Sequence, residues 1–520
     1  MRNRLYFIVV LIIFIVLASL TFSARSAHTQ TSDRQDCAEV AGSPDGCNTV
    51  GGSSYNLLEA GVVGGTISGG GQRTWPNQVR GDFGTVCGGS DNRVGEIAAI
   101  CGGTHNLAAV VRTFVGGGMD NKATADSAAI VGGINNQATG RYAFIGGGFG
   151  NRATDLNATV GGGSGNLAGY RRATVAGGSI NQATSVGSTV GGGVDNVASG
   201  AYATIGGGTE NTSASLNSAI AGGAGNQVSA DAGAITGGIA NRVLDNYSVV
   251  GGGWANQAGD GGEDLQDGAY AVVGGGKENE ASGAYATVPG GAFNRAEGDY
   301  SFAAGREALA QHDGSLIFAD TSGVEFASST ANEFAVRATG GVRLVTAVDG
   351  AGEPQAGTPL AGVLLPAGSG SWATLSDREA KADFDQVDRQ QILSRLAALP
   401  IQTWRYKAQL GDTRHIGPAA QDFYAAFGVG EGERTISTVD ADGVALASIQ
   451  AVYDRLQDKE GEIAALKAEN LALRTDLSRL EARLDALDTA RGFGPNPMIW
   501  IVLMLLAALG KFSILIKKRP

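Results

Sequence analysis

The segment Phe144-Ile145-Gly146-Gly147-Gly148-Phe149-Gly150-Asn151 shows the unit from which the first half of the chain is built. A hydrophobic residue and a Val or Ile precede a run of glycines, two variable residues and an asparagine. The same block returns as Thr204 to Asn211. A fixed short period of this kind predicts a β-solenoid with one repeat per turn. The asparagines, fifteen residues apart, are Asn106, Asn121, Asn136, Asn151, Asn166, Asn181, Asn196, Asn211, Asn226, Asn241 and Asn256.

The residue types within one repeat predict how a turn is built. Glycine permits positive φ and close backbone approach at the corners, and asparagine tolerates the left-handed conformation. Stacked asparagine side chains are expected to form a ladder between turns. The Val or Ile should stack into a single buried ridge. One ridge is a thin core for one chain, so we expect three chains to pack around an axis and bury it.

This array resembles the head repeats of trimeric autotransporter adhesins and the related shafts of phage tail fibres. The resemblance covers residues 61–300 and implies a trimeric head. Its Gly-Gly-Gly runs and strict fifteen-residue step depart from the adhesin pattern, so inherited matrix binding does not follow. An eight-residue insertion, 259–266, interrupts the period before Asn279 and Asn294 resume it.

Composition excludes several classes of protein. The chain has 520 residues, 83 glycines without a Gly-X-Y period, and a formal net charge of −12. Collagen is therefore excluded, and the lack of a basic stripe predicts no nucleic-acid partner. Acidic residues in the repeats stand at variable positions, without the recurring carboxylate pairs of a glycosidase. No Cys/His cluster suggests zinc, and we predict neither a metal nor a cofactor.

The two ends of the chain are hydrophobic. Residues 1–27 have the layout of a signal peptide or of an uncleaved N-terminal anchor, and residues 28–60 form a polar lead-in. Residues 498–516 are long enough for a transmembrane helix, and the basic tail after them predicts a cytoplasmic C-terminus. We therefore expect a single-pass protein of the cell membrane with most of its chain outside the cytoplasm.

The four cysteines fit an oxidising compartment. Cys37 and Cys47 flank a short segment and are candidates for a disulfide that closes a local loop. Cys87 and Cys101 occupy the same position of successive repeats, at a spacing that a disulfide tolerates. Two small buried thiols are the alternative for this second pair.

Residues after the array change in character. Residues 301–348 are expected to form a β-rich cap or neck, and residues 349–375 read as a linker. A set of motifs follows in residues 376–448, where we expect a small α+β domain. These motifs are Ser376-Asp377-Arg378 with Lys381, the segment Pro400 to Tyr406 with Trp404, Ile416-Gly417 with Ala420-Gln421, and Val439-Asp440 before a helix.

In this order the motifs resemble the C-terminal intramolecular chaperone of endosialidase-type tailspikes and tail fibres. The resemblance implies self-cleavage between Leu375 and Ser376, with Ser376 as nucleophile and Lys381 as general base. A serine hydroxyl needs such a base, and a lysine serves only if its pKa falls. The spacing of five residues requires a turn or a helix start between them. The plain alternative is that Ser376 and Asp377 cap the next segment and Lys381 is solvated.

Three further residues are candidates for supporting roles. Asp377 is expected to orient the dyad. His415 is either a second base or a structural residue, and Gln421 either holds the cleavage loop by hydrogen bonds or packs.

Residues 449–490 carry a heptad pattern that predicts a coiled coil. Apolar residues occupy most a and d positions, and Asn470 at an a position is typical of a register device. The residues at the a and d positions alone are compatible with a coiled coil of two or three helices. The resemblance of the head decides for three.

The sequence therefore predicts a membrane-anchored homotrimeric surface or tail-fibre-like protein. Its chaperone domain would drive assembly and cut the chain once, as a single-turnover autoproteolytic serine peptidase. Its partners would be itself, the membrane and a surface ligand, either protein or glycan. The alternative is a non-enzymatic adhesin or surface spike in which the C-terminal domain is only a trimerisation module.

Overall fold

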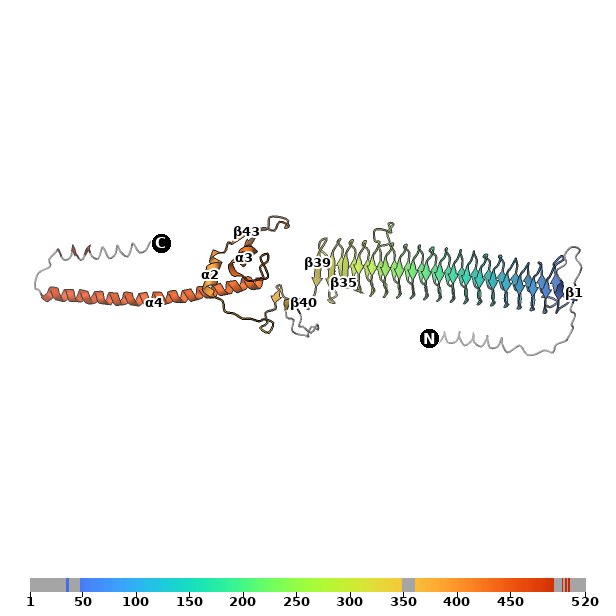
Figure 1. Ribbon diagram of the computed structural model, residues 1–520, viewed down its shortest axis with the longest axis horizontal. Helices are drawn as coiled ribbons and strands as arrows, with labels where there is room; N and C mark the ends of the chain where they lie inside the picture. Colours follow the sequence, from blue (N-terminus) through green and yellow to red (C-terminus); the bar gives the residue numbers. More distant parts are fainter. Residues whose placement is uncertain are drawn as a thin grey trace. The chain divides into compact units, whose positions relative to one another are not determined.

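The computed structural model describes residues 34–36, 47–347, 361–490, 498, 501–502 and 504–505 (Figure 1). These residues fall into two compact units, Met1–Gly341 and Val342–Pro520. The first unit is the predicted solenoid and the second contains the predicted chaperone domain.

The solenoid has about 19 turns, and each regular turn contributes one short strand to each of two parallel ladders. In the Val/Ile ladder, which runs from β2 (Asn48–Val50) to β39 (Phe334–Arg337), β14 (Phe144–Ile145) pairs with its counterparts one turn before and one turn after. In the Ala ladder, which runs from β3 (Leu57–Leu58) to β38 (Phe326–Ala327), β15 (Arg152–Ala153) does the same. Figure 1 shows these strands stacked along one axis.

The core of the solenoid lies inside a single chain. Ile145 in the Val/Ile ladder, Ala153 in the Ala ladder and Ala158 before the next strand are all 0 % exposed. The chain coils around the ridge, and the alanines close it off from the other sides. The expectation that three chains must pack together to bury the ridge is therefore wrong, because it counted one apolar position per turn where the coil brings three together.

The asparagines form the expected ladder along the solenoid. Asn166 is fully buried, and its Oδ1 accepts a hydrogen bond from the backbone N–H of Asn181 at 3.0 Å. Its Nδ2 donates to the carbonyl oxygens of Gly162 and Gly178, both at 2.9 Å. The left-handed conformation does not fall on the asparagine, however. It falls on the residue before it, such as Gly165 or Ile180, with φ of 66° and 61°.

The solenoid is longer than the predicted range of 61–300. It begins with β2, inside the predicted lead-in. After residue 300, β35 (Phe302–Arg306), β37 (Leu316–Ala319) and β39 continue the Val/Ile ladder in parallel, with Ala303 and Ile317 at the ridge. Residues 301–337 are thus solenoid and not a separate cap. Parallel pairing needs only alternation of buried and exposed residues, so it outlasts the Gly-Asn motif.

The second unit is a small mixture of strands and helices. Strands β40 (Gly341–Ala347), β41 (Ala361–Pro366) and β42 (Ala373–Thr374) form one sheet, and β43 (Gln402–Trp404) pairs antiparallel with β44 (His415–Gly417). Strands β41 and β42 replace part of the predicted linker. Helices α2 (Arg389–Ala398), α3 (Ala420–Phe427) and α4 (Thr438–Ala490) surround a core of Leu399, Phe423, Phe427 and Val444.

Helix α4 is continuous through the predicted coiled coil, and its described residues belong to one chain, so the coiled coil itself remains a prediction. The predicted signal or anchor, 1–27, and most of the predicted membrane helix, 498–516, lie outside the described residues. Within the part of the chain that the structure describes, no helix has the length and apolar character needed to cross a bilayer.

Candidate autocleavage site

The bond between Leu375 and Ser376 lies directly after a paired strand. β42 pairs antiparallel with β41, and the register continues past its end, because Leu375 N donates to the carbonyl oxygen of Gly362 at 3.2 Å. The peptide on the N-terminal side of Ser376 is therefore held by the sheet. Ser376 itself is the first residue released from that pairing, and its side chain is exposed.

A tight turn brings Lys381 back to Ser376. Asp377 Oδ1 accepts a hydrogen bond from Glu379 N at 3.0 Å, and Lys381 N donates to the carbonyl oxygen of Arg378 at 3.2 Å. At the end of this turn Lys381 Nζ lies 2.6 Å from Ser376 Oγ. The five-residue spacing is thus bridged by a turn and not by a helix. Asp377 contributes by shaping the turn.

The surroundings of the pair are polar and open in one chain. Lys381 is exposed, and as an ammonium group it donates to the serine hydroxyl. To act as a base it must instead be neutral and accept the hydroxyl proton. Arg378 lies within the same turn, with its guanidinium carbon 5.3 Å from the centre of the Phe384 ring.

An apolar cavity of about 310 Å³ adjoins the Leu375–Ser376 bond. Its walls come from the three strands β40, β41 and β42, so one sheet both holds the peptide and shapes the cavity. Sequence reasoning missed these residues, because it treated their segment as cap and linker. The strand-like run from Gly341 to Val345 was the available signal. The lining residues are Arg343, Leu344, Val345, Gly362, Val363, Leu364, Ala373, Thr374, Leu375 and Ser376.

His415 and Gln421 belong to a different part of the unit. His415 Nε2 lies 2.9 Å from Gln409 Oε1, and its ring centroid is 4.9 Å from that of Trp404 and 5.5 Å from that of Tyr406. Gln421 lines a separate cavity with the same two aromatic residues. Among the described residues no hydrogen bond joins either side chain to Ser376 or Lys381. The role of His415, as a second base or as a structural residue, therefore stays a prediction.

The cysteines fall in the solenoid unit. Cys47 is disulfide-bonded, and Cys37 lies outside the described residues. Cys87 and Cys101 stack on successive turns, where each follows its ladder strand, and both are free and exposed thiols. The alternative prediction of two small buried thiols is therefore wrong. Desolvation, with the Cys87 thiol beside it, raises the pKa of Cys101. The disulfide between them stays a prediction.

Comparison with known protein families bears on the same segment. Residues 376–428 match the model of the peptidase family described as the chaperone of endosialidase. The match begins at Ser376 itself and includes Lys381, His415 and Gln421. No curated protein matches the chain. The expected resemblance is thus confirmed for this segment, which follows a long β-solenoid. The matched family implies an autoproteolytic peptidase domain.

Proposed function

We propose that this protein is a homotrimeric, tail-fibre-like surface protein whose C-terminal chaperone segment assembles the trimer and then cuts the chain once, between Leu375 and Ser376. The observation that carries the proposal is the contact of Lys381 Nζ with Ser376 Oγ at 2.6 Å. The contact stands at the first residue of the chaperone-type match, directly after a strand that holds the peptide to be cut.

The chemistry needs no cofactor. Neutral Lys381 takes the hydroxyl proton of Ser376, and Oγ attacks the carbonyl carbon of Leu375. The C–N bond then breaks, the proton passes to the departing nitrogen, and Leu375 is left as an ester on Ser376 Oγ. Water hydrolyses that ester. The products are a carboxylate at Leu375 and a free amino group and hydroxyl at Ser376, so each chain reacts once.

Trimer assembly would supply the burial that Lys381 lacks in one chain. Large apolar side chains near the site in sequence are uncovered in one chain, since Trp372, Phe384 and Val387 are each more than half exposed. Covering this surface with a neighbouring chain would lower the dielectric around Lys381 and favour its neutral form. Cleavage would then follow assembly and report that it was complete.

The ends of the chain complete the proposal. Residues 1–27 would direct the protein to the membrane as a signal peptide or anchor, and residues 498–516 would fix its C-terminus there. Most of the chain would then be extracytoplasmic, and the solenoid would present its outer face to a protein or glycan. After the cut, the solenoid would stay attached only through contacts between chains or through an uncleaved N-terminal anchor.

Expression of the full-length protein with three single substitutions tests the cleavage step. Wild type should yield a C-terminal fragment of residues 376–520, and Ser376→Ala should yield none. Lys381→Arg should also yield none, because arginine keeps the charge but does not act as a base at neutral pH. Ser371→Ala is the matched control, since Ser371 is also exposed and close in sequence, and it should be cut as wild type.

A non-enzymatic surface spike is the second candidate. The Asp377 turn that places Lys381 would serve equally well as a simple cap for the following segment. In that case the chaperone segment would only hold three chains together. A single uncut chain in wild type and in all three variants would favour this candidate.

A further inference from the structure

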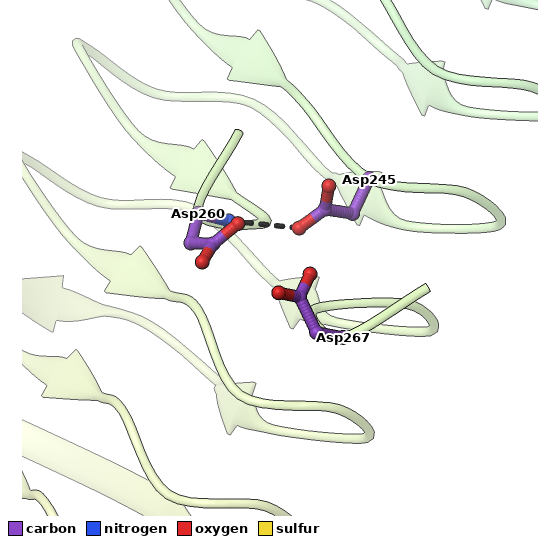
Figure 2. Close-up of side chains that lie close together, drawn as sticks. All are labelled: Asp245, Asp260 and Asp267. Carbon is purple, nitrogen blue, oxygen red and sulfur yellow. Dashed lines mark hydrogen bonds between the residues drawn. The ribbon is translucent and has the colours of Figure 1, made fainter. Parts of the chain in front are cut away.

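Three aspartates converge where the solenoid is interrupted. Asp245 belongs to the turn before the insertion, Asp260 lies within it, and Asp267 follows it. One carboxylate oxygen from each lies within 4.8 Å of the others, and Figure 2 shows the three side chains pointing toward one another. In the Val/Ile ladder the other turns repeat at fourteen to nineteen residues, whereas Val250 pairs with Val273 across this one.

Asp245 is the unusual member of the group. It is 0 % exposed, and its Oδ2 accepts a hydrogen bond from Asp260 N at 2.9 Å. Its Oδ1 is buried and has no hydrogen-bond partner. A buried carboxylate oxygen without a donor is costly, because it loses its water without compensation. Burial, together with the carboxylates of Asp260 and Asp267, raises the pKa of Asp245.

The segment that carries the three aspartates contains no basic residue to balance them. Residues 243–276 contain no lysine, arginine or histidine, whereas the insertion adds Glu263 and Asp264 to the three aspartates. No ion pair involves Asp245, Asp260 or Asp267 among the residues that the structure describes. Two like charges at this distance repel, and three do so more strongly unless a cation or a proton intervenes.

The backbone is shaped to admit the buried carboxylate. A Cβ atom on Gly268 would lie 2.1 Å from Asp245 Oδ2, and one on Gly259, whose φ is +92°, would lie 2.7 Å from it. Gly259 is the first residue of the insertion, and Gly268 follows it. On the open side, Asp260 Oδ1 accepts from Gly262 N at 2.7 Å and Asp267 Oδ1 from Gly268 N at 3.0 Å. These bonds fix the two exposed carboxylates in place, and each retains a second oxygen.

We propose that Asp245, Asp260 and Asp267 bind a divalent cation, Ca²⁺, which fastens the insertion to the solenoid. A hard cation takes oxygen ligands, and Ca²⁺ accepts irregular arrangements of carboxylates, carbonyl oxygens and water. Mg²⁺ demands a near-ideal octahedron and gives up its water reluctantly, so this loop suits it less well. The ion would neutralise the buried carboxylate and join the turn before the insertion to the turn after it. The inference does not depend on cleavage at Ser376.

Calcium binding by the full-length protein tests the proposal. After treatment with EDTA and desalting, wild type should bind one Ca²⁺ per chain by isothermal titration calorimetry. Saturating Ca²⁺ should raise the midpoint of thermal unfolding of the solenoid by at least about 2 °C. Asp260→Asn and Asp267→Asn should each weaken Ca²⁺ binding by about tenfold or more. Both side chains are exposed, so these variants should keep the wild-type circular dichroism spectrum.

Glu263→Gln and Asp264→Asn are the matched controls, because they remove one charge from the same insertion outside the three-aspartate group. They should bind Ca²⁺ as wild type does. An equal loss in controls and test variants would mean diffuse attraction of counter-ions and would overturn the proposal. So would the absence of binding at about 10 mM Ca²⁺, above the range of weak extracellular sites. Stabilisation by acid but not by Ca²⁺ would assign a proton to Asp245 instead.

Discussion

Gly162 and Gly163 are neighbours in one turn of the solenoid and have different backbone environments. Gly163 has φ of +89°, and a Cβ there would lie 2.1 Å from the carbonyl oxygen of Gly178 on the next turn. A Cβ on Gly162 would meet open space. Gly163→Ala should therefore destabilise the solenoid by about 2 kcal/mol or more, through strain and displaced backbone. Gly162→Ala should leave the thermal unfolding midpoint nearly unchanged. Equal midpoints for the two variants, measured by circular dichroism, would contradict this account.

Asn181 shows what each member of the asparagine ladder contributes. Its Oδ1 accepts from Asn196 N at 3.0 Å, and its Nδ2 donates to Gly177 O and Gly193 O at 2.9 and 2.8 Å. Asn181→Ala leaves these backbone groups unpaired in a buried site, and we expect a loss of about 2–4 kcal/mol. Gln182→Ala, at the neighbouring partly exposed position, should cost far less. Chemical denaturation measures the free energy of unfolding of both variants. An equal loss in the two would show that the asparagine ladder does not stabilise the solenoid.

At the residue scale, much of the chemistry could be predicted and the geometry could not. The asparagine period indicated a ladder, and the Ser376 motif indicated a contact with Lys381. The residue with positive φ was placed at the asparagine, one position too late, because asparagine tolerates that conformation, whereas the residue before it, such as Ile180 or Phe293, has no preference for it. The group around Asp245 was missed, because its members are spread over an insertion that the period does not align.

Helix α4 presents an apolar stripe that one chain leaves uncovered. Leu466 and Leu473, at d positions of the heptad, are 56 % and 60 % exposed. Helix α2 packs only near the start of α4, where Arg389 pairs with Asp454 at 3.3 Å and Arg455 Nε donates to Gln390 Oε1 at 2.7 Å. The remainder of the stripe is the length of helix on which we expect the coiled coil to form.

Two leucine variants distinguish association through the heptad seam from nonspecific association of exposed apolar side chains. Leu473→Asp puts a charge into the predicted seam and should dissociate the oligomer. Leu471 is equally exposed, at 67 %, but stands at a b position, so Leu471→Asp should leave the oligomer intact. Analytical ultracentrifugation of the full-length protein in detergent measures both. Dissociation by both variants, or by neither, would argue against this heptad register.

Element boundaries were the least predictable feature of the fold. The repeat motif ends near Asn294, but the parallel ladder continues to β39, because Ala303 and Ile317 still fill the ridge without the Gly-Asn signature. Likewise β41 and β42 lie in a stretch rich in Gly, Ala and Pro that reads as linker. These two strands form by pairing with each other, and such pairing leaves little local signal in the sequence.

Across the whole molecule, the reason to expect three chains has moved from the solenoid to the C-terminal unit. A single chain buries its own Val/Ile ridge, so the head needs no partner to be folded. The exposed α4 seam, the apolar surface beside Ser376 and the chaperone-type match all lie after residue 341. Trimerisation is therefore proposed as a property of this unit.

Because the proposed trimerisation surfaces and the Ser376 site lie in the same unit, we expect cleavage to depend on assembly. If burial in a trimer makes Lys381 neutral, Leu473→Asp should reduce the cut fraction as well as the mass of the oligomer, although it leaves Ser376 and Lys381 unchanged. Leu471→Asp should be cut as wild type. Full cleavage of a monomeric Leu473→Asp protein, measured on gels beside the sedimentation data, would show that the dyad needs no assembly.

The most direct test of the account is intact-mass and N-terminal analysis of the C-terminal product from cells that express the full-length protein. Wild type and Ser371→Ala should yield a fragment that begins at Ser376, and Ser376→Ala and Lys381→Arg should yield none. Full-length wild-type protein without this fragment, or a fragment that persists in Ser376→Ala, would contradict this prediction.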